Sequence, residues 1–357
     1  MKKITSMLLV YALLLLAIPS FAFASENCSS SCYIATTACP AEYIDYAYNN
    51  ISKFILSLHE NVNLDNIHVG TPFAFADADA DVYYFPVLYN GSIKYLFRVY
   101  PDGNSYSAVI SAFLADELNR LAPRTSTNHP LYLNLEDSKI VATIDGDKHI
   151  LFEYPELTES SIISNGAASE QSLSVVDARS VAEITLNLQL TRDVFKYISL
   201  DITEKQGDNS WCTAYCLATI IRTQTTAYTS ALGLMTIALG INPNPSSPLP
   251  WATDSGVKIT NISNQYGLSP TVLTTTVSNE VLIQELNNDR PCIVALQSTA
   301  EPHSVVLRGY SSYGTWGIWN PWFEFYENFT IGGTYVPTGY SSTTYSYTPY
   351  MHAYNFG

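Results

Sequence analysis

Cys212 has the sequence surroundings of a reactive thiol. It lies six residues after Gln206, at the start of a stretch whose apolar residues fall on one face of a helix. The first turn of a helix carries partial positive charge, which favours the thiolate, the nucleophilic form of cysteine. The Gln206 amide, together with the Cys212 N–H, would stabilise an oxyanion formed by attack on a carbonyl group. A buried structural cysteine is the alternative that this segment alone leaves open.

A thiolate nucleophile needs a base, and the second half of the chain contains two histidines, His303 and His352. His303 begins a predicted strand, and Asn320 and Trp322 follow in a Trp-Asn-Pro-Trp sequence. An asparagine carbonyl oxygen can accept from the imidazole N–H and fix the tautomer that faces the sulfur. The Trp322 indole would shield that hydrogen bond from water. No asparagine and tryptophan follow His352 in the same arrangement, so His303 is the predicted base.

The elements that must position these residues are helices followed by strands. Asp208, Asn209 and Ser210 are good N-cap residues for the helix that contains Cys212. Two more helices are predicted at 231–239 and 278–287. Strands are predicted at residues 292–296, 304–310 and 315–320, and in the Tyr/Ser/Thr-rich tail. Helices first and strands later predict an α+β domain.

The first half is predicted to be a separate α+β unit. Helical spacing covers Ala41 to Leu58, and a second helix is predicted over Ser107 to Leu121. The predicted strands are residues 83–89, 93–100, 131–135, 139–144 and 149–154, with tight turns at Asn90-Gly91, Asp102-Gly103 and Asp145-Gly146. Residues 158–180 are small, polar and weakly periodic, which is typical of a linker or an exposed loop.

The N-terminus has the pattern of a secretory signal peptide. Lys2 and Lys3 precede an apolar run, and Ala22-Phe23-Ala24 is a small-x-small cleavage site, so we expect cleavage after about Ala24 and export. The apolar run is short for an uncleaved membrane anchor, and no later run has the length of a membrane span. With 17 Lys+Arg against 32 Asp+Glu in 357 residues, the chain lacks the basic surface of a nucleic-acid-binding protein.

The cysteines do not indicate a metal site. None of the six has zinc-ligand spacing, and the Asp77, Asp79, Asp81 alternation lacks the glycine and glutamate of a calcium loop. We therefore expect no metal and no cofactor. Export permits disulfides, and a Cys216–Cys292 disulfide and two buried free thiols both remain open.

The order Gln, Cys, His, Asn-Pro-Trp resembles the papain superfamily of cysteine proteases and, within it, the staphopain family. The resemblance is carried by QGDNSWCTAY, ELNNDRPCIVAL, HSVVLRGY and IWNPW, and it covers roughly residues 196–329. It implies Cys212 as nucleophile, His303 as general base and acid, Asn320 as orienting residue and Gln206 as oxyanion-hole donor, with Trp322 and Trp211 in support.

The same resemblance implies a secreted endopeptidase that is made as a zymogen and acts as a monomer on protein or peptide substrates. Residues 1–24 would be the signal peptide, 25–190 an inhibitory α+β propeptide and 191–357 a papain-like catalytic domain with a helical lobe and a β-barrel-like lobe. Propeptide cleavage is expected near Gln189 to Asp193. Residues 25–192 carry a net charge of −12 and residues 193–357 carry −5. Docking of the propeptide therefore requires apolar contacts or strand pairing rather than overall charge attraction.

Two other functions stay open at this point. An acyl-transfer enzyme of transglutaminase type would use the same cysteine and histidine with an amine in place of water. A non-catalytic surface-binding protein would use the tail TGYSSTTYSYTPY to contact its ligand.

Overall fold

The computed structural model describes residues 31–58, 66–76, 82–136, 139–153, 173–182, 186, 195–298, 302–337 and 347–357. The expected signal peptide, the Asp77–Asp81 alternation, the expected cleavage region near Gln189 to Asp193 and most of the Tyr/Ser/Thr-rich tail lie outside the described residues. The fold is mixed α+β. We call residues 31–186 the N-terminal half and residues 195–357 the C-terminal half.

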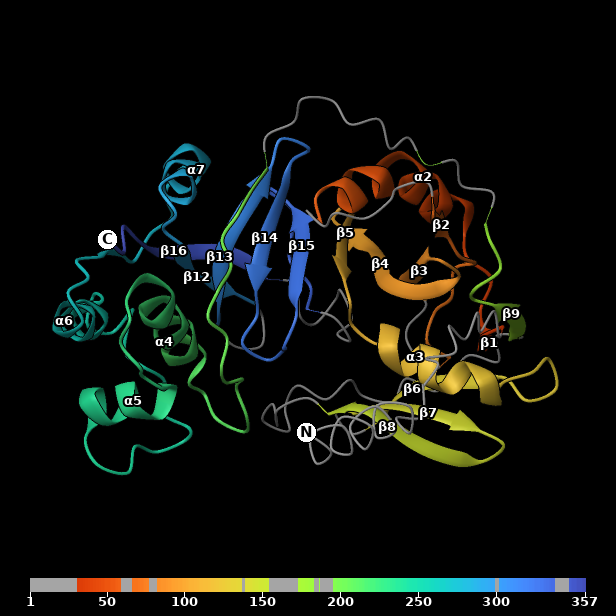
Figure 1. The fold of residues 1–357 in the computed structure, drawn as a ribbon, viewed down its shortest axis with the longest axis horizontal. Helices are drawn as coiled ribbons and strands as arrows, with labels where there is room; N and C mark the ends of the chain where they lie inside the picture. Colours follow the sequence, from red (N-terminus) through yellow and green to blue (C-terminus); the bar gives the residue numbers. More distant parts are fainter. Residues whose placement is uncertain are drawn as a thin grey trace, which may run out of the picture.

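The C-terminal half places helices beside a sheet (Figure 1). Its helices are α4 (Cys212–Gln224), α5 (Ala231–Leu239), α6 (Val257–Gln265) and α7 (Asn279–Asn287). Its strands are β10 (Phe195–Tyr197), β11 (Thr271–Leu273), β12 (Cys292–Gln297), β13 (His303–Ser311), β14 (Thr315–Trp319), β15 (Tyr326–Thr330) and β16 (Thr348–Tyr354). The predicted helices at 231–239 and 278–287 are confirmed. Helix α6 was not predicted, because its apolar residues are sparse among polar ones.

Helix α4 is the buried centre of this half. Every residue from Thr213 to Arg222 is buried, and the helix packs against β12, β13 and α5. The expectation of an Asp208, Asn209 or Ser210 N-cap is wrong: Trp211 is the N-cap residue and makes no side-chain cap hydrogen bond. The reason is local, because Asn209 Oδ1 accepts from the Trp211 N–H at 3.1 Å, which closes a turn before the helix begins.

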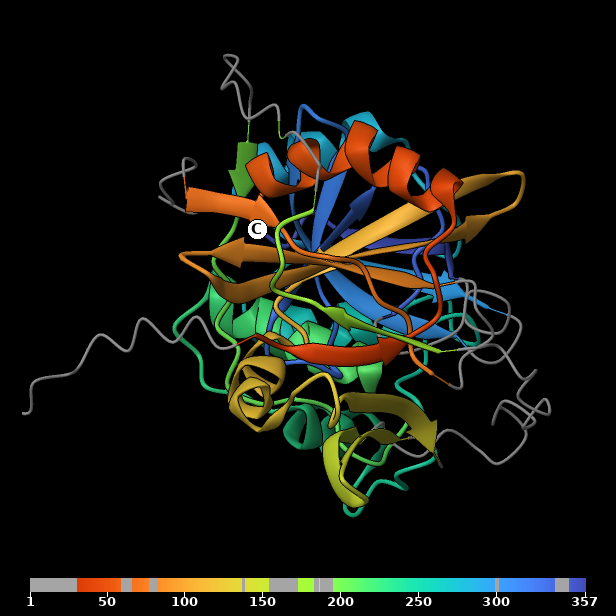
Figure 2. The same cartoon turned by 90° about the vertical axis from the view of Figure 1, so that its right-hand side faces the viewer.

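In the N-terminal half, helix α2 covers a sheet of long strands (Figures 1 and 2). The elements are β1 (Tyr33–Thr36), α2 (Ala41–Leu56), β2 (Ile67–Val69), β3 (Tyr83–Tyr89), β4 (Ser92–Asp102), β5 (Ser105–Ser111), α3 (Ala115–Leu121), a 3₁₀ turn (Ala122–Arg124), β6 (Leu131–Glu136), β7 (Lys139–Ile144), β8 (Asp147–Glu153) and β9 (Ser174–Asp177). Asn90 and Gly91 have φ values of 51° and 80°, so the predicted tight turn between β3 and β4 is confirmed.

Two expectations for the N-terminal half are wrong in part. Only Ala115–Leu121 of the helix predicted at 107–121 is helical, because residues 105–111 form β5 and pair with β4 on one side and β15 on the other. Tertiary pairing thus overrides a weak helical pattern. The predicted linker at 158–180 contains strand β9, which pairs antiparallel with β1. Strand β9 depends on a partner that is distant in the sequence, whereas β5 pairs with the adjacent β4 as well as with the distant β15.

The two halves share one sheet. Its order is β11-β16-β12-β13-β14-β15-β5-β4-β3-β2, with β10 paired to β13, while a second sheet has the order β8-β7-β6-β1-β9. The junction is the antiparallel pair β15–β5, in which Glu327 lies opposite Ser111 and Phe329 opposite Val109 (Figure 1). Strand pairing, one of the two docking modes expected from the charge balance, therefore joins the halves.

Side chains of β4 hold a segment of the C-terminal half beside this junction. The buried Arg98 guanidinium donates to Pro337 O at 2.7 Å and also to Val336 O. The Tyr100 hydroxyl donates to Thr334 O at 2.7 Å. Because alternate residues of a strand point to the same face, β4 presents these groups together. We call residues 334–337 the clamped segment.

Aromatic packing adds to the contact between the halves. The Phe113 ring lies 5.8 Å, centroid to centroid, from the rings of both Phe323 and Phe325, and the Phe152 ring lies 5.5 Å from Phe323. Apolar contact, the second expected docking mode, is thus also present. Across the described parts of the chain, no helix combines the length and apolarity that crossing a bilayer requires.

The Arg98 contacts predict a measurable coupling between the halves. Arg98→Met removes the donors to two buried carbonyl oxygens, so we expect the free energy of unfolding of the full chain to fall by about 3 kcal/mol. Lys94→Met, on the same strand, removes the same charge without removing those bonds and should change stability by less than about 0.5 kcal/mol. Urea unfolding measures both. Equal stabilities of the two variants would contradict the coupling.

Candidate active site

His303 and Asn320 are joined by a buried hydrogen bond. His303 Nε2 and Asn320 Oδ1 are 2.9 Å apart, and the side chains are 3% and 0% exposed. Because the amide oxygen can only accept, Nε2 carries the proton and Nδ1 is left with a lone pair in the neutral ring. The sequence expectation that these two residues lie together agrees with this geometry.

The turn after β14 explains why Trp322 covers this contact. Val306 of β13 pairs with Trp319, the last residue of β14, and the turn that follows carries Asn320 and Trp322 beside His303 at the start of β13. The two rings stack with centroids 3.9 Å apart and an interplanar angle of 23°. The backbone N–H of Trp322 also donates to Asn320 Oδ1 at 3.1 Å. The Asn320 oxygen therefore accepts two hydrogen bonds, and the Trp322 indole ring, stacked on His303, excludes water from them.

Cys212 is the first residue of α4 and is half-buried beside β13. Ser304, the residue after His303, ties the helix to the strand. Its hydroxyl lies 2.8 Å from the Thr213 hydroxyl, and its carbonyl accepts from Cys216 Sγ at 3.3 Å. The start of α4 and the start of β13 are thus held against each other, which brings Cys212 to the strand end that carries His303.

Burial keeps both groups uncharged in the full chain. It raises the pKa of the Cys212 thiol, although hydrogen bonds with Ser304 and Thr213 oppose the shift. Burial also lowers the pKa of His303 to about 4, against an opposing effect of the bond to Asn320. Each shift favours the neutral form. The surroundings in the full chain therefore favour a thiol and a neutral imidazole over a thiolate and an imidazolium.

Gln206 is held in the loop before α4. Its backbone N–H donates to Pro321 O at 2.8 Å, which links this loop to the Trp-Asn-Pro-Trp segment. Its side-chain Nε2 donates to Asn209 O, and the side chain is 7% exposed. An amide nitrogen has two N–H groups, so one remains for an oxyanion. The structure therefore places Gln206 near the Asn320 turn, with part of its donor capacity already used.

The other residues singled out by sequence have different surroundings. Trp211 is buried and donates from Nε1 to Asn244 O at 3.2 Å, which anchors the start of α4. His352 accepts from the Val277 N–H at Nδ1, at 3.1 Å, so this nitrogen is engaged by backbone. Among the described residues, Cys216 and Cys292 are free and buried, so the disulfide alternative is not formed.

Sequence reasoning missed three residues of this region. Burial, followed by the charge that Cys212 carries when it is a thiolate, raises the pKa of Tyr350, so that hydroxyl lies within the electrostatic reach of a Cys212 thiolate. On the far side of the site, Asn320 Nδ2 donates to the Tyr335 hydroxyl at 2.8 Å. That hydroxyl in turn donates to Glu327 Oε2. No motif marks them, because a different strand or loop carries each one.

Comparison with known proteins agrees with the chemistry of this site. Residues 200–342, which contain Cys212, His303 and Asn320, match the family model described as "Peptidase_C39 like family". Two proteins named "Extracellular cysteine protease", from Staphylococcus epidermidis strains ATCC 12228 and RP62A, are each 26% identical over 185 residues. The matched region is 47% of this chain and 47% of each relative, so the chain spans about half the length of these curated relatives. These similarities support a cysteine peptidase, a hydrolase, in the C-terminal half.

The buried histidines predict a stability that depends on pH. The pKa values of His303 and His352 are lowered to about 4, against about 6.5 in an unfolded chain. Between these values the unfolded chain binds more protons, so the free energy of unfolding must fall as pH falls from 6.5 to 4. We expect a loss on the order of 3 kcal/mol for each histidine by pH 4.

Urea unfolding from pH 7.5 to 4.5 measures this dependence. His352→Gln should remove about half of the slope in the window, whereas His68→Gln, at an exposed position of β2, should leave it intact. A slope that neither His352→Gln nor His303→Gln reduces would show that other groups cause the acid sensitivity.

Proposed function

We propose that this chain is a secreted cysteine endopeptidase of the papain type, similar to staphopains, that is made as an inactive precursor. The observation that carries the proposal is the buried His303–Asn320 hydrogen bond under Trp322, at the strand end against which the first residue of α4, Cys212, is packed. The neutral imidazole can accept the thiol proton at Nδ1, and the helix N-terminus stabilises the thiolate that then forms.

The reaction follows from these positions. Nδ1 of His303 takes the thiol proton, and Cys212 Sγ attacks the peptide carbonyl carbon, so that the C=O π electrons move onto oxygen. The Cys212 N–H and the Gln206 amide stabilise this oxyanion. The tetrahedral intermediate collapses, the C–N bond breaks, and His303 gives its proton to the leaving amine. Water then attacks the thioester with His303 as base, which releases the carboxylic acid and restores the thiol.

Asn320 keeps the imidazole in the required tautomer throughout this cycle. Its oxygen accepts the Nε2 proton, so the proton that moves between sulfur and substrate is always on Nδ1. The stacked Trp322 ring excludes water that would compete for Nε2. The neutral thiol and imidazole of the full chain are the resting state expected of a precursor, in which the ion pair has not formed.

The N-terminal half is the proposed inhibitory propeptide. Its docking along β15 and on the clamped segment supports this role, because both elements lie next to the residues that hold Asn320. Cleavage near Gln189 to Asp193 would separate it from the catalytic domain 191–357. N-terminal sequencing should show that the active enzyme begins there, and a first residue outside 160–200 would contradict this boundary.

The extracellular relatives and the signal-like N-terminus support secretion.

Replacement of the nucleophile tests the proposal. Cys212→Ala should lower kcat/KM on a protein substrate by roughly a thousandfold or more, because no other group can form the thioester. The free energy of unfolding should change little, since the side chain is half-buried. Cys292→Ala, which alters a buried thiol on β12, is the matched control and should retain activity.

Cleavage of casein, followed by gel electrophoresis and release of acid-soluble peptides, measures the effect. Full activity of Cys212→Ala would overturn the assignment. Stable crosslinks without cleavage, formed when a primary amine is present, would indicate acyl transfer in place of hydrolysis.

A further inference from the structure

The orientation of the Asn320 amide decides whether the proposed site can work. In the observed orientation Oδ1 faces His303 Nε2 and accepts its proton. A flipped amide would present Nδ2 to Nε2, and the neutral ring would then carry its proton on Nδ1. That tautomer cannot take a proton from a thiol. Asn320 is fully buried, so water cannot set its orientation and the protein must do so.

The Tyr335 hydroxyl lies on the other side of the amide and accepts from Asn320 Nδ2 at 2.8 Å. A hydroxyl can also donate, and then it would favour the flipped amide. What fixes its direction is Glu327, whose carboxylate Oε2 accepts the one proton that the hydroxyl has. Glu327 is 0% exposed and Tyr335 is 0% exposed, so neither is exchanged for water.

Tyr335 keeps the proton that this direction requires. Burial, followed by the charge of Glu327, raises the pKa of Tyr335 well above its ordinary value. The hydroxyl therefore keeps its proton over the range in which a cysteine peptidase works. The backbone N–H of Trp322 donates to Asn320 Oδ1 at 3.1 Å and supports the same orientation from the opposite end of the amide.

We propose that Tyr335 and Glu327 are positioning residues: Glu327 accepts the Tyr335 proton, Tyr335 consequently accepts from Asn320, and the amide oxygen is held toward His303. The proposal rests on the proposed peptidase function and adds two residues to its site. Both lie C-terminal to the expected cleavage region, so they remain with the catalytic half after activation.

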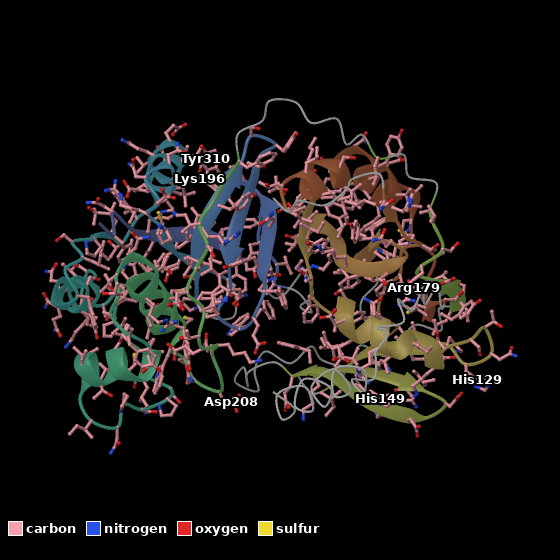
Figure 3. All side chains as sticks on the ribbon, viewed as in Figure 1. His129, His149, Arg179, Lys196, Asp208 and Tyr310 are labelled. Carbon is pink, nitrogen blue, oxygen red and sulfur yellow. The ribbon has the colours of Figure 1, made fainter. Side chains whose placement is uncertain are left out.

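The kinetic test compares two tyrosine-to-phenylalanine variants of the activated enzyme. Tyr335→Phe removes the hydroxyl that holds Asn320. Tyr310→Phe, on β13 (Figure 3), removes a similar bond, from its hydroxyl to Asn287 Oδ1 at 2.8 Å, away from the site. Active sites are counted with an irreversible thiol inhibitor. We expect Tyr335→Phe to lower kcat about tenfold to a hundredfold with KM little changed, and Tyr310→Phe to match the wild type.

A double-mutant cycle separates positioning from a structural role. If Tyr335 acts through Asn320, Tyr335→Phe should cause no further loss in an Asn320→Ala background. Glu327→Gln should fall between the wild type and Tyr335→Phe, because an amide can still accept from the hydroxyl but can also reverse the bond. Equal kcat values for Tyr335→Phe and Tyr310→Phe would overturn the proposal. It would also be overturned if Tyr335→Phe lowered kcat by the same factor in the wild-type and Asn320→Ala backgrounds.

A readout that does not depend on activity covers the case in which the peptidase assignment fails. In the full-length Cys212→Ala protein, with ¹⁵N-labelled histidine, we expect the His303 ring to be protonated at Nε2. Tyr335→Phe in that background should add signal from the Nδ1-protonated form. An unchanged tautomer would overturn the positioning role even if Cys212 is the nucleophile. A changed tautomer together with full activity of Cys212→Ala would overturn only the peptidase assignment.

Discussion

The hydrogen bond between His303 Nε2 and Asn320 Oδ1 is the interaction on which the rest of the site depends. It depends on the pairing of β13 with β14, because the turn that carries Asn320 and Trp322 directly follows β14. It also requires the β13 start to lie against the first turn of α4, which the Ser304 contacts provide. The helix and the strands therefore contribute different parts of the proposed proton-transfer path: the thiol from the helix, and the imidazole and Asn320 amide from the sheet.

The N-terminal half contacts the elements that hold this hydrogen bond. Strand β15 carries Glu327, which lies opposite Ile318 of β14 on one side and Ser111 of β5, in the N-terminal half, on the other. The clamped segment carries Tyr335 between the backbone groups that Arg98 and Tyr100 bind. Removal of the N-terminal half would leave β15 as an edge strand with unpaired backbone groups. The contacts that join the halves and the contacts of the Asn320 amide are thus neighbours, which gives docking a direct physical connection to the candidate site.

Sequence alone located the candidate site but not its supports. Cys212, His303 and Asn320 could be found because each lies at a local sequence signal. Cys212 lies at the start of a predicted helix, His303 at the start of a predicted strand and Asn320 at the end of another. Helix α5 and the Asn90-Gly91 turn were likewise encoded locally. Strand β5, which the Asp102-Gly103 turn joins to β4, was missed because a helix was predicted from Ser107. Strand β9 could not be found, because its partner β1 is distant in the sequence. Tyr335, Glu327 and Tyr350 gave no signal for the same reason: their roles come from three-dimensional contacts, and tyrosine is frequent throughout this chain.

Selective labelling of the activated enzyme tests most directly the claim that Cys212 is the reactive thiol of this site. The rate of alkylation by an epoxide inhibitor of thiol proteases, mapped residue by residue with mass spectrometry, compares Cys212 with the buried Cys216 and Cys292 in one sample. We expect Cys212 to be modified first, with loss of activity in proportion and with a rate that falls when Asn320 is replaced by alanine. Modification of Cys216 or Cys292 with Cys212 unreacted, accompanied by inactivation, would contradict the assignment.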